Sequence, residues 1–392
     1  MDKRLPRSIW ILGLVSLLMD VSSEMIHSLL PVFMVGSLGL SALTVGFIEG
    51  AAEATALVIK VFSGALSDFW GRRKPLTLLG YGLGAATKPL FAIASGAGLI
   101  VAARLIDRVG KGIRGAPRDA LIADIAPADQ RGAAFGLRQS LDTVGAFLGP
   151  LIAIALMLAT QDDFQIVFWI AVIPAAMAVL ALALGVQEPD RPRSHRASSP
   201  IHIESLKKLP RAYWWVVGIG AMFTLARFSE AFLVLRVQQG GLPLALVPLV
   251  LVGMNVVYAL SAYPFGKLAD RLPHGALLAL GVFMLIAADL LLAQANQGLT
   301  AWAGIALWGL HMGMTQGLLA AMVAENAPAD LRGTAFGIFH LISGLAMLMA
   351  SVVAGFLWDR HGAEFTFFAG IMFCALTLIV LGLRRSALKA QL

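Results

Sequence analysis

Long apolar segments, separated by short polar stretches, repeat along the whole chain. A helix that crosses about 30 Å of hydrocarbon needs about 20 mostly apolar residues. Because lipid cannot satisfy backbone polar groups, each such segment is expected to be an α-helix, in an all-α membrane fold. The twelve predicted spans are 9–35, 42–66, 75–95, 99–120, 133–158, 165–186, 212–236, 244–266, 275–294, 299–323, 333–356 and 364–384.

The composition supports a membrane protein. The chain is 58% hydrophobic and 14% charged, whereas soluble chains carry about 25% charged residues. Its single cysteine, Cys374, excludes a disulfide framework and a cysteine-ligated zinc site. The net charge of +7 comes from short basic clusters between apolar segments. That distribution is typical of the loops of a membrane protein, so we expect a lipid bilayer and no nucleic acid as partner.

Lysine and arginine gather in alternate loops, which predicts the orientation. Basic residues are enriched in cytoplasmic loops. Both termini are therefore expected in the cytoplasm, the location is a bacterial-type cytoplasmic (inner) membrane, and the first span is retained and not cleaved as a signal peptide. The basic positions are Lys3, Arg4 and Arg7; Arg72, Arg73 and Lys74; Arg131; Lys267 and Arg271; and Arg384 and Arg385.

Two segments recur with nearly one offset. The segment from Asp124 to Gly136, with Ala-Pro-Ala-Asp and Arg-Gly at its centre, recurs 201 residues later from Glu325 to Gly337. The residues 64–68 (GALSD) recur as 266–270 (GKLAD) at an offset of 202. The halves are therefore interpreted as copies in the same orientation: an N-terminal six-helix bundle at 1–186, a cytoplasmic linker at 187–211 and a C-terminal six-helix bundle at 212–392.

The loop after the second span carries a family resemblance. Gly64-Ala-Leu-Ser-Asp68-Phe-Trp-Gly71-Arg72-Arg73-Lys74 resembles the loop 2–3 signature of the major facilitator superfamily, with Phe69 where an arginine is usual. Gly266-Lys-Leu-Ala-Asp270-Arg271 resembles its degenerate second copy. The resemblance covers the whole chain. It implies two parallel bundles, a central midplane site, alternating access gated by these motif residues, and a monomer.

Two further signatures imply coupling and direction. Arg108-Val-Gly-Lys111-Gly112 resembles the span-4 signature of proton-coupled members, with Lys111 in place of the usual glutamine. Gly145-Ala-Phe-Leu-Gly149-Pro150 resembles the span-5 signature of exporters, without the glycines expected beyond the proline. The resemblance implies an antiporter that exports a solute in exchange for protons, with a helix kink at Pro150. Import and sodium coupling remain open.

Ionisable side chains within spans are functional candidates, since they are costly in lipid. Asp20, Glu24 and His27 are spaced i, i+4, i+7 and share one helix face with Ser23. Our hypothesis is that Asp20 or Glu24 titrates during transport and that Arg108, at a similar depth, sets its proton affinity. The structural alternative is a fixed ion pair.

The N-terminal half carries more of these groups, so the coupling machinery is expected there. Arg227 and Glu230, at i and i+3, are expected to neutralise each other. The further candidates for the substrate cavity are Glu49, Glu53, Lys111, Arg114, Arg138, Asp142, Arg227, Glu230, His311 and His340.

Three substrate classes are compatible with these residues. Drug-like organic cations, which acidic groups beside an apolar cavity would bind, rank first. Divalent transition metals rank second, because carboxylate, imidazole and thioether groups are possible ligands; the candidates are Asp20, Glu24, His27, His311 and Met312. Anionic metabolites rank third, on the cluster of Arg108, Lys111, Arg114 and Arg118. Arg114 and Arg118 could instead simply pair with Asp119 and Asp124.

The other function classes lack sequence support. There is no nucleophile and base constellation, no Gly-x-x-x-x-Gly-Lys-Ser/Thr loop and no soluble output domain. We therefore expect neither an enzyme nor a sensor, and no cofactor. The expected partners are a small-molecule or ion substrate and protons.

Overall fold

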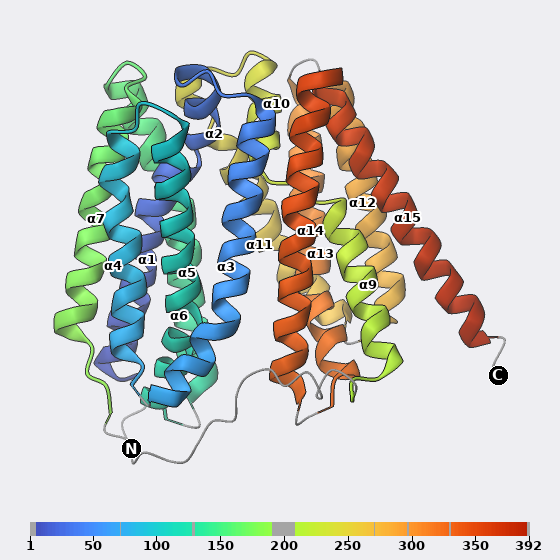
Figure 1. The fold of residues 1–392 in the computed structure, drawn as a ribbon, viewed down its shortest axis with the longest axis horizontal. Coiled ribbons are helices and arrows are strands. Elements are labelled where there is room, and N and C mark those ends of the chain that lie inside the picture. Colours follow the sequence, from blue (N-terminus) through green and yellow to red (C-terminus); the bar gives the residue numbers. More distant parts are fainter. Residues whose placement is uncertain are drawn as a thin grey trace. The chain divides into compact units, whose positions relative to one another are not determined.

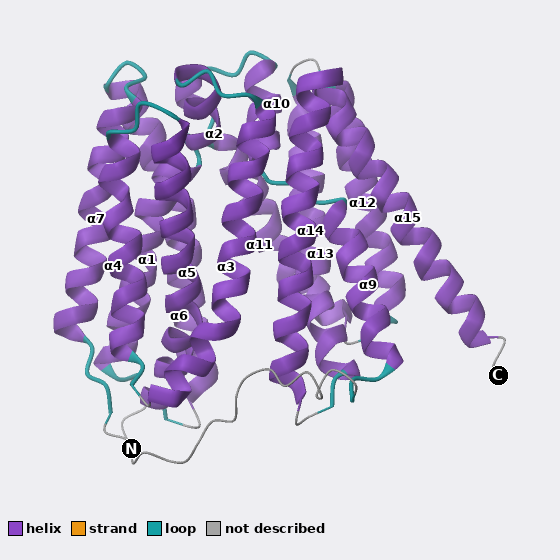
Figure 2. Ribbon diagram, in the orientation of Figure 1, coloured by secondary structure: helices purple, strands orange, loops and turns teal. Residues whose placement is uncertain are grey.

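The computed structural model describes residues 5–70, 72–127, 130–189, 208–269, 271–295, 298–328 and 331–389. The side chains of Ala65, Asp68, Phe69, Arg332, Gly333 and residues 384–389 are not described. Throughout these ranges the regular secondary structure is helical (Figures 1 and 2). The expected all-α class is confirmed.

The first half of the chain forms α1 (Arg7–His27), α2 (Leu30–Val32), the π-helical turn η1 (Phe33–Ser37), α3 (Ala42–Trp70), α4 (Lys74–Ala92), α5 (Ala97–Ile125), α6 (Arg131–Ala159) and α7 (Phe164–Gly185). The second half forms α9 (Arg211–Leu225), α10 (Ala231–Gln239), the 3₁₀ turn η3 (Leu244–Leu246), α11 (Leu249–Ala269), α12 (His274–Gln294), α13 (Leu299–Asn326), α14 (Arg332–His361) and α15 (Ala363–Lys389).

A helix lies at each of the twelve predicted spans, but they do not all look like membrane helices. In the described ranges, eight helical segments are long and apolar enough to cross a bilayer. The segments that do not qualify are α4, α5, the pair α9 and α10, and α13. They are either interrupted by polar and charged residues or too short. The chain is thus a multi-pass membrane protein, and the number of twelve crossings stays a prediction.

Three predicted spans are not continuous helices, and this corrects the sequence interpretation. The span 9–35 breaks after His27, one turn before Pro31, and the span 244–266 starts with a separate 3₁₀ turn. The span 212–236 breaks between Leu225 and Ala231 without any proline. There the backbone N–H of Ser229 donates to the hydroxyl of Ser351, at 3.1 Å, instead of to its own helix. Such a distant partner has no local sequence signal.

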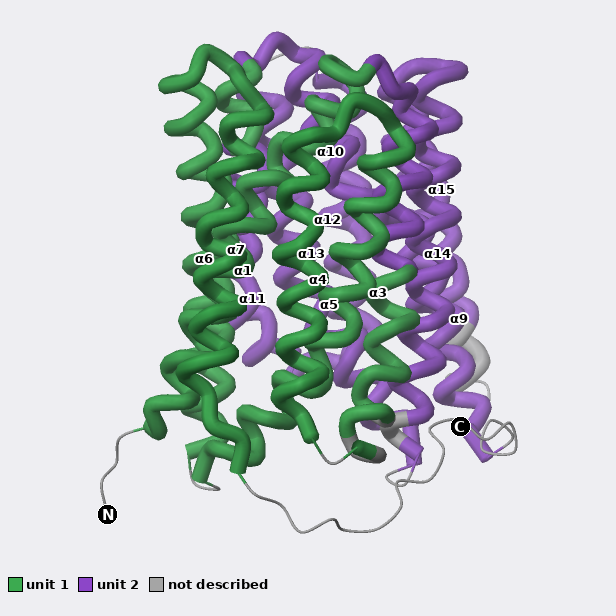
Figure 3. The backbone as a smooth tube through the Cα atoms, turned by 60° about the vertical axis from the view of Figure 1, so that its left-hand side comes forward, with its two compact units in different colours: residues 1–38, 55–200, 244–248 green, residues 39–54, 201–243, 249–392 purple. Residues whose placement is uncertain are grey.

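The chain divides into two compact units (Figure 3). Unit 1 comprises residues 1–38, 55–200 and 244–248, and unit 2 comprises residues 39–54, 201–243 and 249–392. Helix α3 therefore contributes its first part to unit 2 and the rest to unit 1. The predicted boundaries at 186 and 211 stay a prediction, and most of the linker, residues 190–207, lies outside the described residues.

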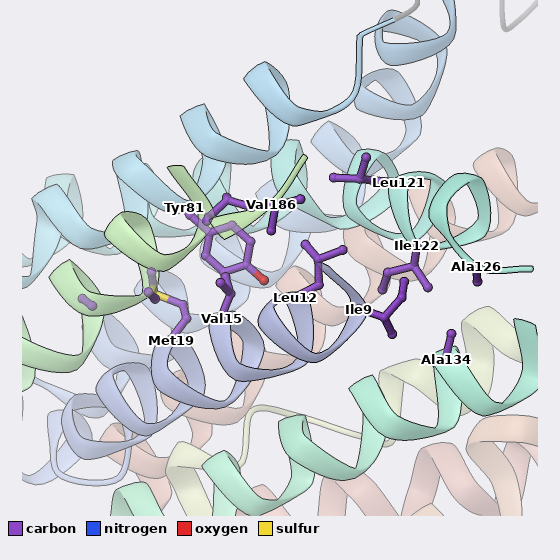
Figure 4. Packing of buried hydrophobic residues seen from close by; sticks show 13 residues of the cluster. Ile9, Leu12, Val15, Met19, Tyr81, Leu121, Ile122, Ala126, Ala134 and Val186 are labelled. Atoms are coloured by element: carbon purple, nitrogen blue, oxygen red, sulfur yellow. The ribbon is translucent and has the colours of Figure 1, made fainter. Parts of the chain in front are cut away.

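In unit 1, α1 packs against α6 and α7, and α4 packs against α5 and α7. One part of this packing is an apolar cluster with buried residues from each of these helices (Figure 4). Tyr81 lies within the cluster and keeps its hydroxyl for polar contacts, as described below. The labelled members are Ile9, Leu12, Val15, Met19, Tyr81, Leu121, Ile122, Ala126, Ala134 and Val186.

Equivalent glycine contacts occur in the two halves. A side-chain carbon at Gly80 of α4 would lie 2.7 Å from Cβ of Arg114 in α5. At an offset of 201, a side-chain carbon at Gly281 of α12 would overlap Thr315 of α13. Both glycines thus let the same two helices of each half approach closely. The repeat seen in the sequence therefore recurs in the packing.

A second pair of equivalent contacts joins α5 to α3 in the first half and α13 to α11 in the second half. A side-chain carbon at Gly112 of α5 would lie 2.7 Å from Cβ of Ile59. Its counterpart Gly313 faces Ser261, and its added carbon would lie 3.0 Å from Cβ of Ser261. The offsets are 201 and 202, as in the sequence motifs. The two halves are copies at the level of individual helix contacts.

We predict that Gly112→Ala destabilises the protein. The added methyl group would also lie 2.9 Å from the carbonyl oxygen of Ala56, and such overpacking costs about 1–3 kcal/mol. The matched control is Gly115→Ala on the same helix, where the nearest atom, in Lys60, is 3.9 Å away. Thermal unfolding of the purified variants would measure the difference. Equal stability of the two variants would contradict the close packing of α3 on α5.

Candidate functional site

Helices α1, α4, α5 and α6 bring together a set of ionisable side chains that we call the unit 1 polar network. The members on α5 recur every three or four residues and so share one helix face. The network consists of Asp20, Glu24 and His27 on α1; Lys88 on α4; Arg104, Asp107, Arg108, Lys111, Arg114, Arg118 and Asp119 on α5; and Arg138 and Asp142 on α6.

The centre of the network is an ion pair between α4 and α5. The Lys88 ammonium donates to Asp107 Oδ1 at 3.0 Å and to the Ser23 hydroxyl at 3.1 Å. Lys88 is fully buried and Asp107 is 4% exposed. Two charges this deep are stable only when paired and hydrogen-bonded. This contact therefore fixes α4 to α5 and places both beside the polar face of α1.

His27 links the acidic face of α1 to α5. Its Nε2 contacts the guanidinium of Arg104, and its Nδ1 lies 3.5 Å from Arg108 Nη2. The ring also lies 3.7 Å from a carboxylate oxygen of Glu24 on one side and of Asp107 on the other. An arginine only donates hydrogen bonds, so a ring nitrogen bonded to it must accept. A neutral imidazole has one acceptor nitrogen, so Nε2 accepts from Arg104 and Nδ1 carries the N–H, on the side of Glu24.

Arg114 and Arg118 lie farther along the same face of α5. The guanidinium of Arg114 lies over the ring of Tyr81, 4.5 Å from its centre. Arg118 donates to Ser16 at 3.3 Å, to Tyr81 at 3.4 Å and to Asp119 at 3.1 Å. Arg118 and Asp119 thus form the simple ion pair that was the alternative to an anion-binding role. Arg114 pairs with an aromatic ring and lies near the carboxyl of Asp20.

Asp20 of α1 and Asp142 of α6 lie within hydrogen-bonding reach of each other. The other neighbour of Asp142 is Arg138, whose Nη2 lies 3.8 Å from its Oδ2. Because ionised carboxylates only accept hydrogen bonds, one of the two acids must carry a proton for this contact to be attractive. The two acids are therefore the candidate pair for a proton shared between two helices.

The glycines of the exporter-like motif seat α1 on α6 beside these acids. A side-chain carbon at Gly145 would lie 3.0 Å from Cβ of Asp20, and one at Gly149 would lie 2.8 Å from Cβ of Glu24. Helix α6 continues through Pro150. The motif thus positions the acidic face of α1 by close packing of α6 on α1.

Carboxyl groups are the more accessible part of the network. The side chains of Glu24 and Asp142 are 27% and 24% exposed. Arg104 and Arg108 are buried, at 3% and 4%. Lys111 is the exposed exception among the cations and lies within electrostatic range of Glu24. Glu24 and Asp142 are therefore more accessible than Arg104 and Arg108.

Several candidates from the sequence belong to unit 2 and not to this network. Glu49, which is buried, and Glu53 lie in the first part of α3. In α14, His340 stacks on Phe336. The other candidates of this group are Arg227, Glu230, His311 and Met312. Arg227 lies within electrostatic range of Glu230, as expected, and its guanidinium lies 5.7 Å from the ring centre of Phe223.

Sequence reasoning missed the central lysine. Lys88 is a solitary charge in the middle of the predicted span 75–95, and this isolation was a usable signal. Tyr81 and Ser16 were also missed, because a tyrosine or serine in an apolar segment has no such signal.

The metal alternative gains no support from the arrangement of ligands. Within the described residues, no group of three or more histidine, cysteine, aspartate and glutamate side chains is placed to hold a metal ion. Of the candidates, His27 is already bonded to arginine.

The predicted gating loop forms a latch on α5. Arg73 donates to Asp124 at 3.1 Å and to Ser67 at 2.6 Å, and its backbone N–H contacts Glu188. At the offset of 201, His274 and Glu325 form the equivalent pair, 3.1 Å apart. Among the described side chains, the acid that pairs with the Arg73 guanidinium is Asp124, from the repeated segment.

The remaining gating residues differ between the copies. Gly64 packs against Ala116, as expected, with its added carbon 3.3 Å from Cβ. Around Gly266 the described atoms leave open space within 4 Å, so the second copy has no such contact. Arg72 is exposed, and the backbone N–H of Arg271 donates to Leu268 at 3.0 Å. The side chain of Asp68 and all of Gly71 and Asp270 lie outside the described residues.

Comparisons with known proteins agree with this architecture. The family model of the Major Facilitator Superfamily matches residues 12–350. An uncharacterized MFS-type transporter of Methanocaldococcus jannaschii is 31% identical, over 97% of this chain and 95% of its own. The multidrug resistance protein MdtH of Photorhabdus laumondii is 30% identical over 39% of this chain and 37% of its own. The structure of a POT family transporter in complex with 5-aminolevulinic acid superposes with a TM-score of 0.78, at 13% identity, over 97% of this chain and 96% of that one.

We predict that Lys88→Met strongly destabilises unit 1. Removing one partner of a buried pair leaves the other charge unpaired, which costs about 3–5 kcal/mol. The matched control is Lys60→Met, because Lys60 is exposed on α3. Adding Asp107→Asn to Lys88→Met should restore part of the loss. Thermal unfolding in detergent measures all three, and a Lys88→Met protein as stable as Lys60→Met would remove the pair from its central role.

We also predict unequal contributions from the two latch pairs. The Asp124 side chain is 9% exposed, so Asp124→Asn should cost about 1.5–3 kcal/mol, as expected for a hydrogen bond to a charged group. The Glu325 side chain is 60% exposed, and Glu325→Gln should cost at most about 1 kcal/mol. The same unfolding assay compares them. A larger loss from Glu325→Gln would contradict this ranking.

Proposed function

Since this chain belongs to the Major Facilitator Superfamily, we propose that it exchanges protons for a solute, with Asp20, Glu24 and Asp142 as the coupling carboxyls. The chain is a multi-pass membrane transporter of small molecules and not an enzyme. The proposal concerns how its transport is driven and what it carries.

The contact between Asp20 and Asp142 carries the proposal. We assign one shared proton to these two carboxyl groups, on α1 and α6, which lie within hydrogen-bonding reach of each other. Arg138 lies beside Asp142, with its Nη2 3.8 Å from Oδ2, and we assign the shared proton to the two acids as one unit. If that proton leaves, two like charges face each other, which is unfavourable unless a cation takes its place. A positively charged substrate and a proton then compete for the same acids.

Competition for one site produces exchange in opposite directions. Glu24 lies one helical turn from Asp20 and is partly exposed. Lys111 lies within electrostatic range of both acids, so its ammonium limits their negative charge when both are ionised. Arg108 also lies within electrostatic range of Glu24, so we keep the predicted pairing of these two residues and add Lys111 to it.

For the substrate we propose a drug-like organic cation, exported from the cytoplasm. The accessible carboxyls support a cation, and the partial similarity to a multidrug resistance protein supports a drug-like molecule. We further propose twelve crossings, both termini in the cytoplasm, a monomer in a bacterial-type inner membrane, and a latch between Arg73 and Asp124 that breaks when access alternates.

An anionic substrate is the second candidate, favoured by one observation. The unit 1 polar network contains seven lysines and arginines and five acids. A protonated acid raises this positive excess, so an anion would bind together with a proton and not in competition with it. The two candidates therefore predict opposite signs of coupling: exchange for a cation and cotransport for an anion.

A thermal-shift screen at two pH values tests the proposal, because a ligand of the folded state raises its apparent stability. Organic cations should stabilise the protein more at the higher pH. Asp20→Asn and Asp142→Asn should weaken their binding at least tenfold, about 1.4 kcal/mol. The best ligand is then tested in proteoliposomes with an internal pH dye.

The matched control is Asp162→Asn, in the loop between α6 and α7. Anions that stabilise the protein more at the lower pH would replace the first substrate class with the second. Transport of the screened ligand that moves protons equally in wild type, Asp20→Asn, Asp142→Asn and Glu24→Gln would remove these carboxyls from the mechanism.

A further inference from the structure

Asp289 is a buried acid in unit 2, on α12, which the proposed function does not use. It is fully buried. Neither of its carboxyl oxygens has a hydrogen-bond partner in the part of the chain that the structure describes. An isolated charge in a medium of low dielectric constant is very costly, so such a group either neutralises or acquires a ligand.

The internal repeat explains why this acid is isolated. At the offset of 201, Asp289 is the counterpart of Lys88, and Trp308 is the counterpart of Asp107. The first half therefore has an ion pair where the second half has an acid and a buried aromatic ring. Asp289 is thus an ionisable residue at the position of Lys88, but the position of its partner Asp107 is taken by the uncharged Trp308.

The Asp289 carboxyl lies beside Gly370 of α15, close to the end of α9. A side-chain carbon at Gly370 of α15 would overlap Asp289 Oδ2, and it would lie 3.3 Å from the carbonyl oxygen of Ala226. Ala226 caps the end of α9, and no described residue donates a hydrogen bond to its carbonyl. Gly370 thus leaves room for an acid and an unsatisfied carbonyl group to meet.

The ionisable neighbours come from every helix around this point. Cys374 of α15 lies within electrostatic range of both Asp289 and Arg227. Arg227 directly follows Ala226 and is within range of His311 on α13 and of Glu230. His311 is fully buried between the rings of Phe223 and Trp308. Within the part of the chain that the structure describes, no lysine, arginine or other carboxyl group lies within electrostatic range of Asp289 itself.

We propose that Asp289 is a second proton-binding site of this transporter, in which the protonated carboxyl faces the Ala226 carbonyl at the break between α9 and α10. A carboxylic acid supplies the one donor that this carbonyl lacks. The site holds one proton, and its release leaves a carboxylate that needs Arg227 as its counter-charge. Arg227 is adjacent to Ala226 in the chain. A change in the backbone at the break between α9 and α10 would therefore move the Ala226 carbonyl and the Arg227 guanidinium together.

This site is independent of the unit 1 polar network, and its test requires no substrate. Infrared spectroscopy of the full-length protein in lipid nanodiscs detects the carbonyl stretch of a protonated carboxylic acid and its shift in D₂O. Asp289→Asn should remove one such band at neutral pH. Cys374→Ser should shift this band without removing it, and Gly370→Ala should shift it as well, because the added methyl group displaces the carboxyl.

Two controls separate this site from the others. Asp20→Asn should leave the Asp289 band unchanged, whatever its effect on transport, so the two proposals can fail separately. Spectra in sodium chloride and in choline chloride should agree. A protonated-acid spectrum that is unaffected by both Asp289→Asn and Gly370→Ala overturns the inference, as does a carboxylate band at Asp289 that responds only to sodium.

Discussion

The buried ion pair between Lys88 and Asp107 is the constraint around which unit 1 is organised. The two charges lie 3.0 Å apart, and Asp107 also has His27 at 3.7 Å and Arg108 at 4.0 Å, so both buried charges are compensated. Lys88 also donates a hydrogen bond to Ser23 of α1, and His27 of α1 lies near Asp107. The pair therefore also determines which face of α1 turns inward. The acids on that face are thereby held beside α6, where Asp20 lies within hydrogen-bonding reach of Asp142.

The two halves share their packing but not their chemistry. Gly80 and Gly281 make equivalent close contacts, and the latch pairs recur at the same offset. Yet Lys88 corresponds to Asp289, and Arg114 corresponds to Thr315. Close packing between helices constrains small residues, whereas the ionisable positions were free to diverge. One copy became a dense network of paired charges, and the other retained an isolated acid beside a helix break.

The prediction from the sequence was accurate where the physical signal is local. Apolar length predicted a helix at each span, and the spacing of Asp20, Glu24 and His27 predicted a shared face that does lie against other polar side chains. It failed where the signal is not local. The break before Ala231 depends on the hydroxyl of Ser351, which is 122 residues from its partner Ser229. Lys88 was overlooked because a single charge hardly changes the mean hydropathy of a span.

The sequence by itself therefore determined the class of the protein, its internal repeat and the residues that are costly in a membrane, because each follows from composition, period or offset along the chain. Only the tertiary structure decided the pairing: Lys88 with Asp107, Asp20 with Asp142, Arg73 with Asp124, and Asp289 with no partner among the described side chains. The physical reason is that the energy of a buried charge depends on which groups lie within a few ångströms of it. That distance is set by the packing of helices and not by their order.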